Sequence, residues 1–218
     1  MSSRERNPDP RERNPDPRER NPDHGTIVID LLRHGEVEGG VCLRGSTDDL
    51  LSRLGWRQMA AAVAAASWDF IISSPLRRCS DFAQALGQRL DIPLHWEARL
   101  RELHFGLWEG QTTETLMRTH PEALAKFWQA PYAHPPPGAE SLQVFERRVL
   151  DAWRGITLTH GGRRVLVITH GGVIRVILRH VRGLPVDDLL RIDVPYASLH
   201  RVVVSHQKAH AVRVPRCG

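Results

Sequence analysis

The string LLRHGE at residues 31–36 decides the fold, because an apolar run that starts near residue 26 ends there abruptly in arginine, histidine and glycine. Such a run is typical of a buried parallel strand. A second string, VITHGG at residues 167–172, has the same design. Ligands of open α/β sheets bind at the carboxyl ends of the strands. The two strings therefore predict that His34 and His170 face one site for an anion and a nucleophile.

Strand-like and helix-like segments alternate along most of the chain, which favours a layered α/β domain with a mainly parallel sheet. A terminal hairpin, joined by a polar turn, makes the sheet mixed. Ser141 is expected to cap the helix that follows it. The expected strands are residues 26–32, 69–73, 93–96 and 164–169, with the hairpin at 199–205 and 211–214. The expected helices are residues 53–66, 78–90, 112–127, 142–158 and 172–181, and residues 100–108 are expected to form a loop.

Three copies of a heptapeptide occupy residues 4–24, reading RERNPDP twice and then RERNPDH. The repeat has no apolar face, and proline interrupts any helix in it, so it can neither form a coiled coil nor bury surface. We expect residues 1–24 to be a disordered tail and residues 25–218 to form one domain. A targeting peptide would need the apolar face that the tail lacks.

The composition limits the class of partner. The 218 residues carry a formal net charge of +5, and almost all basic residues are arginine, which suits phosphate binding. Genomic base composition is an alternative explanation for the surface arginines. The sequence has no basic stripe with interleaved aromatics, the pattern that would predict a nucleic-acid partner. It also has no apolar run long enough to span a membrane. Cys42, Cys79 and Cys217 lack disulfide or metal spacing, so we expect a cytoplasmic protein.

The ends of three predicted strands carry candidate site residues. Arg33 and His34 end the first, and a neutral histidine is a nucleophile that needs no strong base. Positive neighbours disfavour its protonation. Gly171, after His170, opens a helix whose backbone N–H groups can face an anion. Arg78 begins the helix after SSPLR at residues 73–77. Each residue taken alone also fits an ordinary structural role, such as a capping histidine or a solvated arginine.

The segment ELHFGLWEG at residues 102–110 places carboxylates among apolar and aromatic residues. Desolvation raises the pKa of a carboxyl group, as a general acid near neutrality requires. The alternative is that Glu102 or Glu109 forms a structural pair with an arginine.

Together these segments resemble the histidine phosphatase superfamily, also called the phosphoglycerate mutase-like family. Four motifs occur in the family's order between about residues 27 and 205. PGAES at residues 137–141 also matches the family's Pro-Gly-Gly-Glu-Ser, with alanine in place of the second glycine. The resemblance implies a three-layer αβα sandwich with a mainly parallel mixed sheet. The four motifs are LRHGE at 32–36, SSPLRR at 73–78, ELHFGLWEG at 102–110 and THGG at 169–172.

The resemblance also implies roles. His34 becomes phosphohistidine, and Glu102 is the general acid and then the general base. Arg33, Arg78 and His170 form the phosphate pocket. No metal or cofactor is implied, and the physical chemistry agrees, since two arginines and a histidine can stabilise the charge of a transferring phosphoryl group.

Two residues after the first motif depart from the pattern of the mutases. Val37 and Gly40 stand where many mutases and broad phosphatases carry threonine and asparagine. LRGSTDD at residues 43–49 and SPLRRC at residues 74–79 resemble the proteobacterial alpha-ribazole phosphatase branch instead. That branch removes phosphate from alpha-ribazole 5'-phosphate during assembly of the cobalamin lower ligand.

The resemblance leaves two alternatives open: a broad phosphatase for sugar phosphates or nucleotides, and an inactive relative that binds a phosphoryl ligand. Arg44, Thr47 and Gly171 are further candidates for substrate contact. The oligomeric state stays open, a dimer being one alternative.

Overall fold

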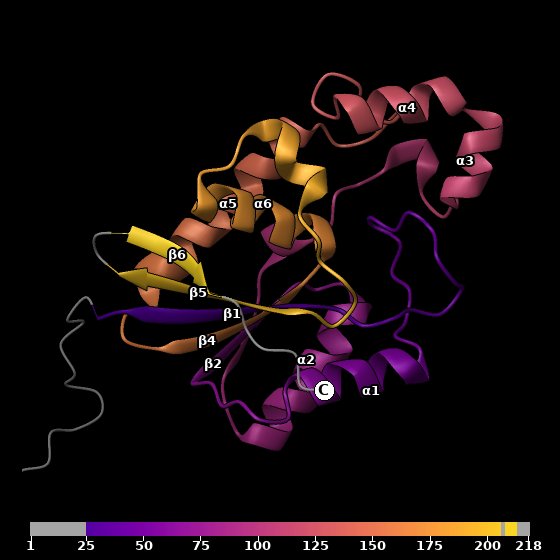
Figure 1. The fold of residues 1–218 in the computed structure, drawn as a ribbon. Helices are drawn as coiled ribbons and strands as arrows, with labels where there is room; N and C mark the ends of the chain where they lie inside the picture. The colour runs from indigo at the N-terminus through magenta and orange to yellow at the C-terminus, as the bar shows by residue number, and fades with distance from the viewer. Residues whose placement is uncertain (1–24, 206–207, 213–218) are drawn as a thin grey trace, which may run out of the picture.

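The centre of the molecule is a mixed sheet, six-stranded within the described part of the chain, in the order β3-β2-β4-β1-β5-β6 (Figure 1). The structure, a computed structural model, describes residues 25–205 and 208–212. The predictions for residues 1–24 and Cys217 lie outside these ranges. Strands β1 to β4 pair in parallel, whereas β5 and β6 pair antiparallel, as expected. The strands are β1 Ile27–Arg33, β2 Phe70–Ser73, β3 Leu94–Trp96, β4 Arg164–Thr169, β5 Leu199–Ser205 and β6 Lys208–Val212.

Helices cover both faces of the sheet (Figure 1). Helices α1 (Arg53–Ala62) and α2 (Arg77–Leu90) lie on one face, and α5 (Leu142–Thr159) and α6 (Gly171–Arg182) lie on the other. Side chains alternate along a strand, so the central strands supply both layers of core. Val165 and Val167 of β4 join the α5–α6 core, whereas Leu166 and Ile168 join the α1–α2 core. The predicted αβα sandwich is confirmed.

The helix predicted over residues 112–127 is wrong, because two helices occupy this stretch. Helix α3 covers Thr113–Thr119 and α4 covers Pro121–Gln129. His120, between them, has φ −141° and ψ 49°, outside the helical region. Proline disfavours a helical conformation in the residue before it, yet fits the first position of a new helix because its missing N–H is not needed there.

Smaller differences concern where elements begin and end. The first helix stops at Ala62 rather than residue 66, and the last strand starts at Lys208 rather than residue 211. Short 3-10 turns, Ala98–Leu100 and Gly106–Trp108, flank or interrupt the predicted loop, and another covers Val186–Arg191. Ser141 does cap α5, since its side chain accepts a hydrogen bond from the Val144 N–H.

The strand register brings three chain segments to one edge of the sheet. Arg33 of β1 lies opposite Thr169 of β4, and the His34 N–H donates to the Thr169 carbonyl at 2.9 Å. The next residue after each strand, His34 or His170, therefore leaves the sheet beside the other. Strand β2 ends at the same edge, where the Ser74 N–H donates to the Ile168 carbonyl at 3.0 Å. The two histidines that the strings place together do lie side by side at this edge.

Candidate active site

His34 is a buried, neutral imidazole with one free nitrogen. Its side chain is only 6% exposed, and Nδ1 lies 2.8 Å from the Gly35 carbonyl oxygen. A carbonyl can only accept, so Nδ1 carries the proton and Nε2 keeps its lone pair. Burial lowers the pKa of His34 to about 3, with further contributions from the charges of Arg78 and Arg33. The prediction from the sequence was that positive neighbours keep His34 neutral, but its burial lowers the pKa more than their charges do.

His170 is fully buried beside His34, the ring centroids being 5.3 Å apart. Its Nδ1 accepts from Nε of Arg78 at 3.2 Å, so Nε2 carries the proton and donates to the Ser74 hydroxyl at 2.7 Å. Burial, then the charge of Arg78, holds the pKa of His170 well below its usual value. The ring thus orients Arg78, and its predicted contact with phosphate stays a prediction.

Arg33 and Arg78 supply the positive charge of the site. Arg33 stacks over the Tyr196 ring at 4.2 Å and donates to the Val194 carbonyl, whereas its Nε is buried without a hydrogen-bond partner. Arg78 is fully buried, with hydrogen bonds to the Thr47 and Gly45 carbonyls and to His170. Burial lowers the pKa of Arg33 from its ordinary value. A buried, unpartnered guanidinium N–H is poised to bind an anion.

Glu102 is held at the start of helix α6 by backbone groups. The Leu103 N–H donates to Oε1 and the Gly172 N–H to Oε2, both at 2.9 Å. A Cβ at Gly172 would lie 2.3 Å from Oε1, so this position admits only glycine while Glu102 stays in place. Among the residues that the structure describes, neither carboxylate pairs with an arginine, since that of Glu102 accepts the two N–H groups just named and that of Glu109 accepts backbone N–H groups of the loop at residues 45–47. The arginine-pairing alternative is therefore wrong for both.

The other predicted contact residues take different positions. Arg44 forms an ion pair with Asp49 and hydrogen bonds within its own loop, so its guanidinium is already engaged, although its charge contributes to the low pKa of His34. The Thr47 hydroxyl donates to Glu109, and its carbonyl accepts from Arg78. Gly171 does lie at the site, since a Cβ there would be 3.3 Å from Nε of Arg33.

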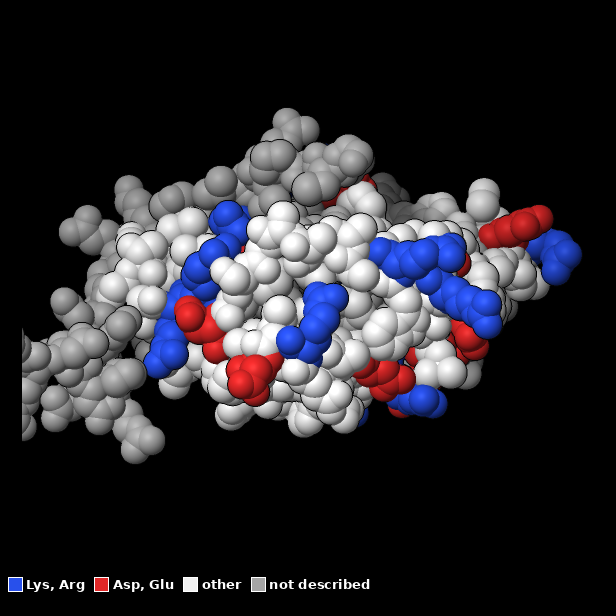
Figure 2. Space-filling view, turned by 90° about the horizontal axis from the view of Figure 1, so that it is seen from below, with Lys and Arg blue, Asp and Glu red and all other residues white. Residues whose placement is uncertain are grey.

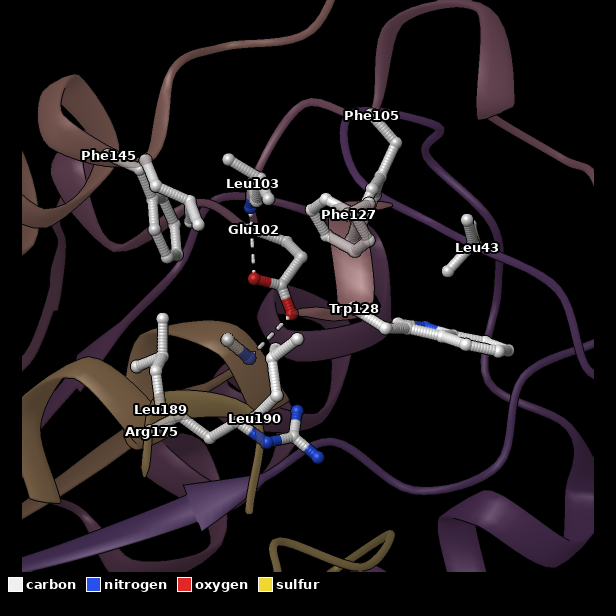
Figure 3. Close-up of a pocket in the computed structure, with 12 residues that line it drawn as sticks. Leu43, Glu102, Leu103, Phe105, Phe127, Trp128, Phe145, Arg175, Leu189 and Leu190 are labelled. Carbon is white, nitrogen blue, oxygen red and sulfur yellow. Dashed lines mark hydrogen bonds between the residues drawn. The ribbon is translucent and has the colours of Figure 1, made fainter. Parts of the chain in front are cut away.

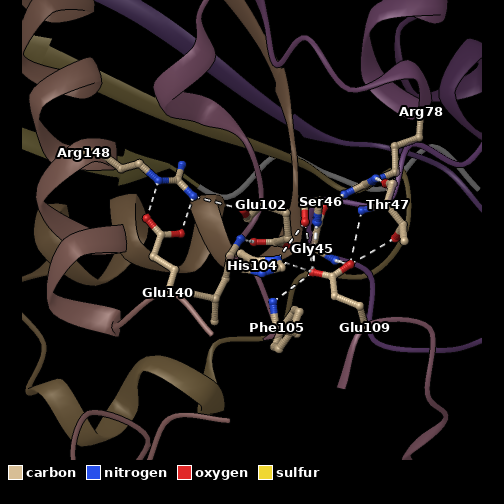
Figure 4. Close-up of polar contacts among 11 residues, drawn as sticks. Gly45, Ser46, Thr47, Arg78, Glu102, His104, Phe105, Glu109, Glu140 and Arg148 are labelled. Atoms are coloured by element: carbon tan, nitrogen blue, oxygen red, sulfur yellow. Dashed lines mark hydrogen bonds and ion pairs between the residues drawn. The ribbon is translucent and has the colours of Figure 1, made fainter. Parts of the chain in front are cut away.

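Sequence reasoning missed Arg148, which braces the segment that carries Glu102. Its guanidinium pairs with both oxygens of Glu140, at 2.7 and 2.8 Å (Figure 4). It also donates to the carbonyls of Arg99, Arg101 and Glu102. Glu140 belongs to the PGAES motif. The sequence does not show that Arg148 braces Glu102, because the three carbonyls to which it donates belong to a segment more than 40 residues away.

Arg175 was also missed, although a signal for it exists. It follows Gly171 by four residues on helix α6 and so lies on the same helix face. Its Nε donates to the Ile192 carbonyl at 2.9 Å, and its guanidinium lines a pocket with Glu102 (Figure 3).

The pocket beside Glu102 is mostly apolar. Its volume is about 480 Å³, and Trp128 and Leu190 stay 49% and 39% exposed at it. Exposed large apolar side chains around a cavity indicate a binding surface. The lining residues are Leu43, Glu102, Leu103, Phe105, Phe127, Trp128, Leu142, Phe145, Gly172, Arg175, Leu189 and Leu190.

Residues 29–215 match the family model of the histidine phosphatase superfamily, branch 1. The chain belongs to this family. It is 35% identical over 176 residues to the glucosyl-3-phosphoglycerate phosphatase of Mycolicibacterium vanbaalenii, a match that covers 72% of this chain and 75% of the relative. This histidine phosphatase is accordingly a phosphoric monoester hydrolase.

Solved structures agree with the fold. Bacillus stearothermophilus YhfR, 28% identical, superposes with a TM-score of 0.78 over 85% of this chain and 95% of that chain. The alpha-ribazole phosphatase of Shigella flexneri, 23% identical, has a TM-score of 0.74 over 86% of this chain and 95% of that chain. The second likeness shows a shared fold and nothing finer.

The surface seen in Figure 2 mixes charges of both signs. On the face seen in Figure 2, basic and acidic side chains lie side by side rather than in a stripe of one sign. Within residues 25–205 and 208–212, no helix is long and apolar enough to cross a membrane. The same ranges hold no group of three or more His, Cys, Asp or Glu side chains arranged to bind a metal ion. The expectations of no nucleic acid, no cofactor and a cytoplasmic location stay predictions.

Proposed function

We propose that this histidine phosphatase hydrolyses phosphomonoesters through a phosphohistidine at His34, without a metal ion. The observation that carries the proposal is the free Nε2 of a neutral, buried His34 beside the guanidinium groups of Arg33 and Arg78. A lone pair in this setting is ready to attack phosphorus, and the guanidinium groups stabilise charge on the phosphoryl oxygens.

The reaction has two displacements. First, Nε2 of His34 bonds to phosphorus as the ester P–O bond breaks, and protonated Glu102 gives its proton to the leaving oxygen. Then the Glu102 carboxylate takes a proton from water, the water oxygen attacks phosphorus, and the N–P bond breaks. Inorganic phosphate leaves, and His34 is neutral again.

The substrate that we favour is alpha-ribazole 5'-phosphate. Its leaving group joins a ribose to a flat, largely apolar base, which suits a pocket of aromatic and aliphatic side chains next to Glu102. Trp128, half-exposed at this pocket, offers a face for stacking (Figure 3).

A sugar phosphate is the second candidate. The relative that is 35% identical is named for a glucosyl-phosphoglycerate substrate, and Arg175 places a cation in the same pocket. A guanidinium group suits a carboxylate on the leaving group.

The mechanism is tested by trapping the phosphorylated enzyme in acid-free quench and locating the phosphate by mass spectrometry. We expect the label on His34, and a loss of kcat of at least about a thousandfold in His34→Ala. His95→Ala, which removes an exposed histidine of β3, is the control and should behave as wild type. Wild-type turnover by His34→Ala would refute the proposal.

The substrate is tested by comparing kcat/KM for alpha-ribazole 5'-phosphate, glucosyl-3-phosphoglycerate and glycerol phosphate. For the first, Trp128→Ala should lower kcat/KM by roughly tenfold, the effect of one lost aromatic contact. Trp96→Ala is a matched control, because Trp96 is also 49% exposed but does not line the pocket. A flat profile across the three substrates would favour the broad phosphatase.

A further inference from the structure

Within residues 25–205 and 208–212, the partners that fix the buried guanidinium of Arg78 are all neutral. Nε donates to Nδ1 of His170 at 3.2 Å, Nη1 to the Thr47 carbonyl at 2.6 Å and Nη2 to the Gly45 carbonyl at 2.7 Å. Arginine has five N–H bonds, so two remain for a ligand. None of these three partners is a carboxylate, and the charge of Arg78 is therefore available to phosphate.

The loop that holds Arg78 is itself held by Glu109 (Figure 4). Three successive backbone N–H groups, of Gly45, Ser46 and Thr47, donate to the Glu109 carboxylate at 3.2, 3.0 and 3.2 Å. The carbonyls of Gly45 and Thr47 point to Arg78, whereas the N–H groups of the loop point to Glu109. The loop thus lies between an anion and a cation.

One peptide group connects the two charges directly. The Gly45 carbonyl and the Ser46 N–H belong to the same peptide bond, and they bind Arg78 and Glu109, respectively. An anion at the N–H end makes the carbonyl at the other end a better acceptor, since hydrogen bonds in a chain polarise one another. Glu109 can therefore orient Arg78 without neutralising it, as a direct ion pair would.

Glu109 also connects this loop to the segment that carries Glu102. The Phe105 N–H donates to Oε1 of Glu109 at 2.9 Å, and the His104 ring lies 3.2 Å from the same oxygen. Burial tends to raise the pKa of Glu109, but the backbone N–H groups outweigh it and hold the pKa below its ordinary value. The carboxylate is ionised at neutral pH and keeps all of these bonds.

We propose that Glu109 is a positioning residue for Arg78, acting through the peptide groups of Gly45–Thr47 so that the two free N–H bonds of the guanidinium meet the phosphate. The inference rests on the proposed phosphatase site. It does not depend on which phosphomonoester is the substrate, because phosphate itself reports on Arg78.

The test is binding of inorganic phosphate, measured by isothermal titration calorimetry with the full-length protein. Glu109→Gln removes the charge and turns an amide N–H towards backbone donors. We expect the dissociation constant for phosphate to rise roughly tenfold, with a larger fall in kcat/KM than in kcat for p-nitrophenyl phosphate. Unchanged phosphate binding would overturn the inference.

Two further variants separate positioning from general loop stability. Asp49→Asn breaks the ion pair with Arg44 in the same loop but leaves the Gly45–Thr47 peptides alone, and it should change phosphate binding less than about twofold. In an Arg78→Lys background, Glu109→Gln should cause no further loss, because residues that act as a unit are non-additive. If the losses of phosphate affinity caused by Arg78→Lys and Glu109→Gln multiplied in the double variant, Glu109 would only stabilise the loop. The same conclusion would follow if Asp49→Asn weakened phosphate binding as much as Glu109→Gln does.

If Glu109→Gln does not fold, Glu109→Asp replaces it. The shorter carboxylate keeps the charge but withdraws from the Ser46 N–H, so phosphate binding should weaken while the melting temperature stays near wild type. Wild-type binding by this variant would count against the inference. If the wild-type protein bound phosphate but formed no phosphohistidine, the proposed mechanism would be refuted while the inference about Glu109 and Arg78 would stand.

Discussion

The rings of His34 and His170 meet edge to face with their centroids 5.3 Å apart, and both are neutral. Two adjacent imidazolium ions would repel each other and the neighbouring arginines. The positive charge of the site therefore comes from Arg33 and Arg78, and the histidines contribute a lone pair and a hydrogen-bond acceptor. Their neutrality has a measurable consequence for stability.

We predict that the protein loses stability as pH falls from 6.5 towards 3. Burial and the nearby arginines lower the pKa of His34 from 6.5 to about 3, so in this window the unfolded chain binds a proton that the native state does not. Stability is thus fully present above pH 6.5 and declines with falling pH. Urea unfolding between pH 7 and pH 4 measures the slope.

Replacing the histidine should reduce that slope. Asparagine in His34→Asn can still donate to the Gly35 carbonyl but does not titrate, so its unfolding free energy should depend less on pH than that of wild type. His95→Asn, an exposed change, should keep the wild-type slope. An equal slope in all three proteins would show that His34 is not the group responsible.

A single methyl group at Gly172 should disable the general acid. The Cβ of Gly172→Ala would lie 2.3 Å from Oε1 of Glu102, so the carboxylate must leave its position. We expect kcat to fall roughly a hundredfold or more, because general acid–base catalysis contributes about that much. The measurement is steady-state turnover with p-nitrophenyl phosphate and with alpha-ribazole 5'-phosphate.

Gly155→Ala is the matched control, since a Cβ at this position of α5 has no neighbour nearer than 3.9 Å. This change should leave kcat unaltered and stabilise the protein by roughly 0.5–1 kcal/mol, as alanine does in a helix interior. If Gly172→Ala kept wild-type turnover, Glu102 would not act from the position seen here.

Much of this architecture could be predicted from local patterns. Apolar runs that end in histidine and glycine identified β1 and β4, and a serine marked the start of α5. The break at His120 was missed because apolar residues such as Leu116 and Leu124 lie on both sides of it, whereas the ring of Pro121 disfavours a helical conformation at the residue before it. The local sequence pattern therefore predicts an element well where the burial of one of its faces determines that the element forms.

Contacts between distant segments could not be predicted in this way. Arg44 and Arg78 are both arginines near a predicted site, yet one turns to Asp49 within its own loop and the other enters the site. Which arginine enters the site depends on the position of the loop at residues 45–47, which Glu109, more than 60 residues away, holds in place. No spacing in the sequence encodes that contact.

The heptapeptide repeats should be dispensable for catalysis. All of the residues that we place in the site lie between Arg33 and Tyr196, and the family match begins at residue 29. A chain without residues 1–24 should have kcat/KM within about twofold of the full chain, as expected for a terminal segment that carries no site residue. A large loss of activity would assign the repeats a part in the reaction.

Asp30 should contribute to stability rather than to catalysis. It is fully buried on β1, directly opposite Arg201 of β5, whose Nε and Nη2 donate to its two oxygens at 2.8 and 3.0 Å. Trp68 Nε1 donates to the same carboxylate at 2.9 Å. Asp30→Asn keeps the size of the side chain but leaves a donor facing these donors. We expect chemical denaturation to show a loss of about 2–3 kcal/mol, since a broken buried ion pair leaves its partner uncompensated.

Arg191→Ala provides the comparison for Asp30→Asn, because the ion pair of Arg191 with Asp188 is largely exposed. Its removal should cost less than about 1 kcal/mol, as is usual for surface pairs. In the folded Asp30→Asn protein, phosphate binding should equal that of wild type, since Asp30 contacts neither the arginines of the site nor Glu102. Weakened phosphate binding would mean that the β1–β5 pairing also sets the position of Arg33 at the end of β1.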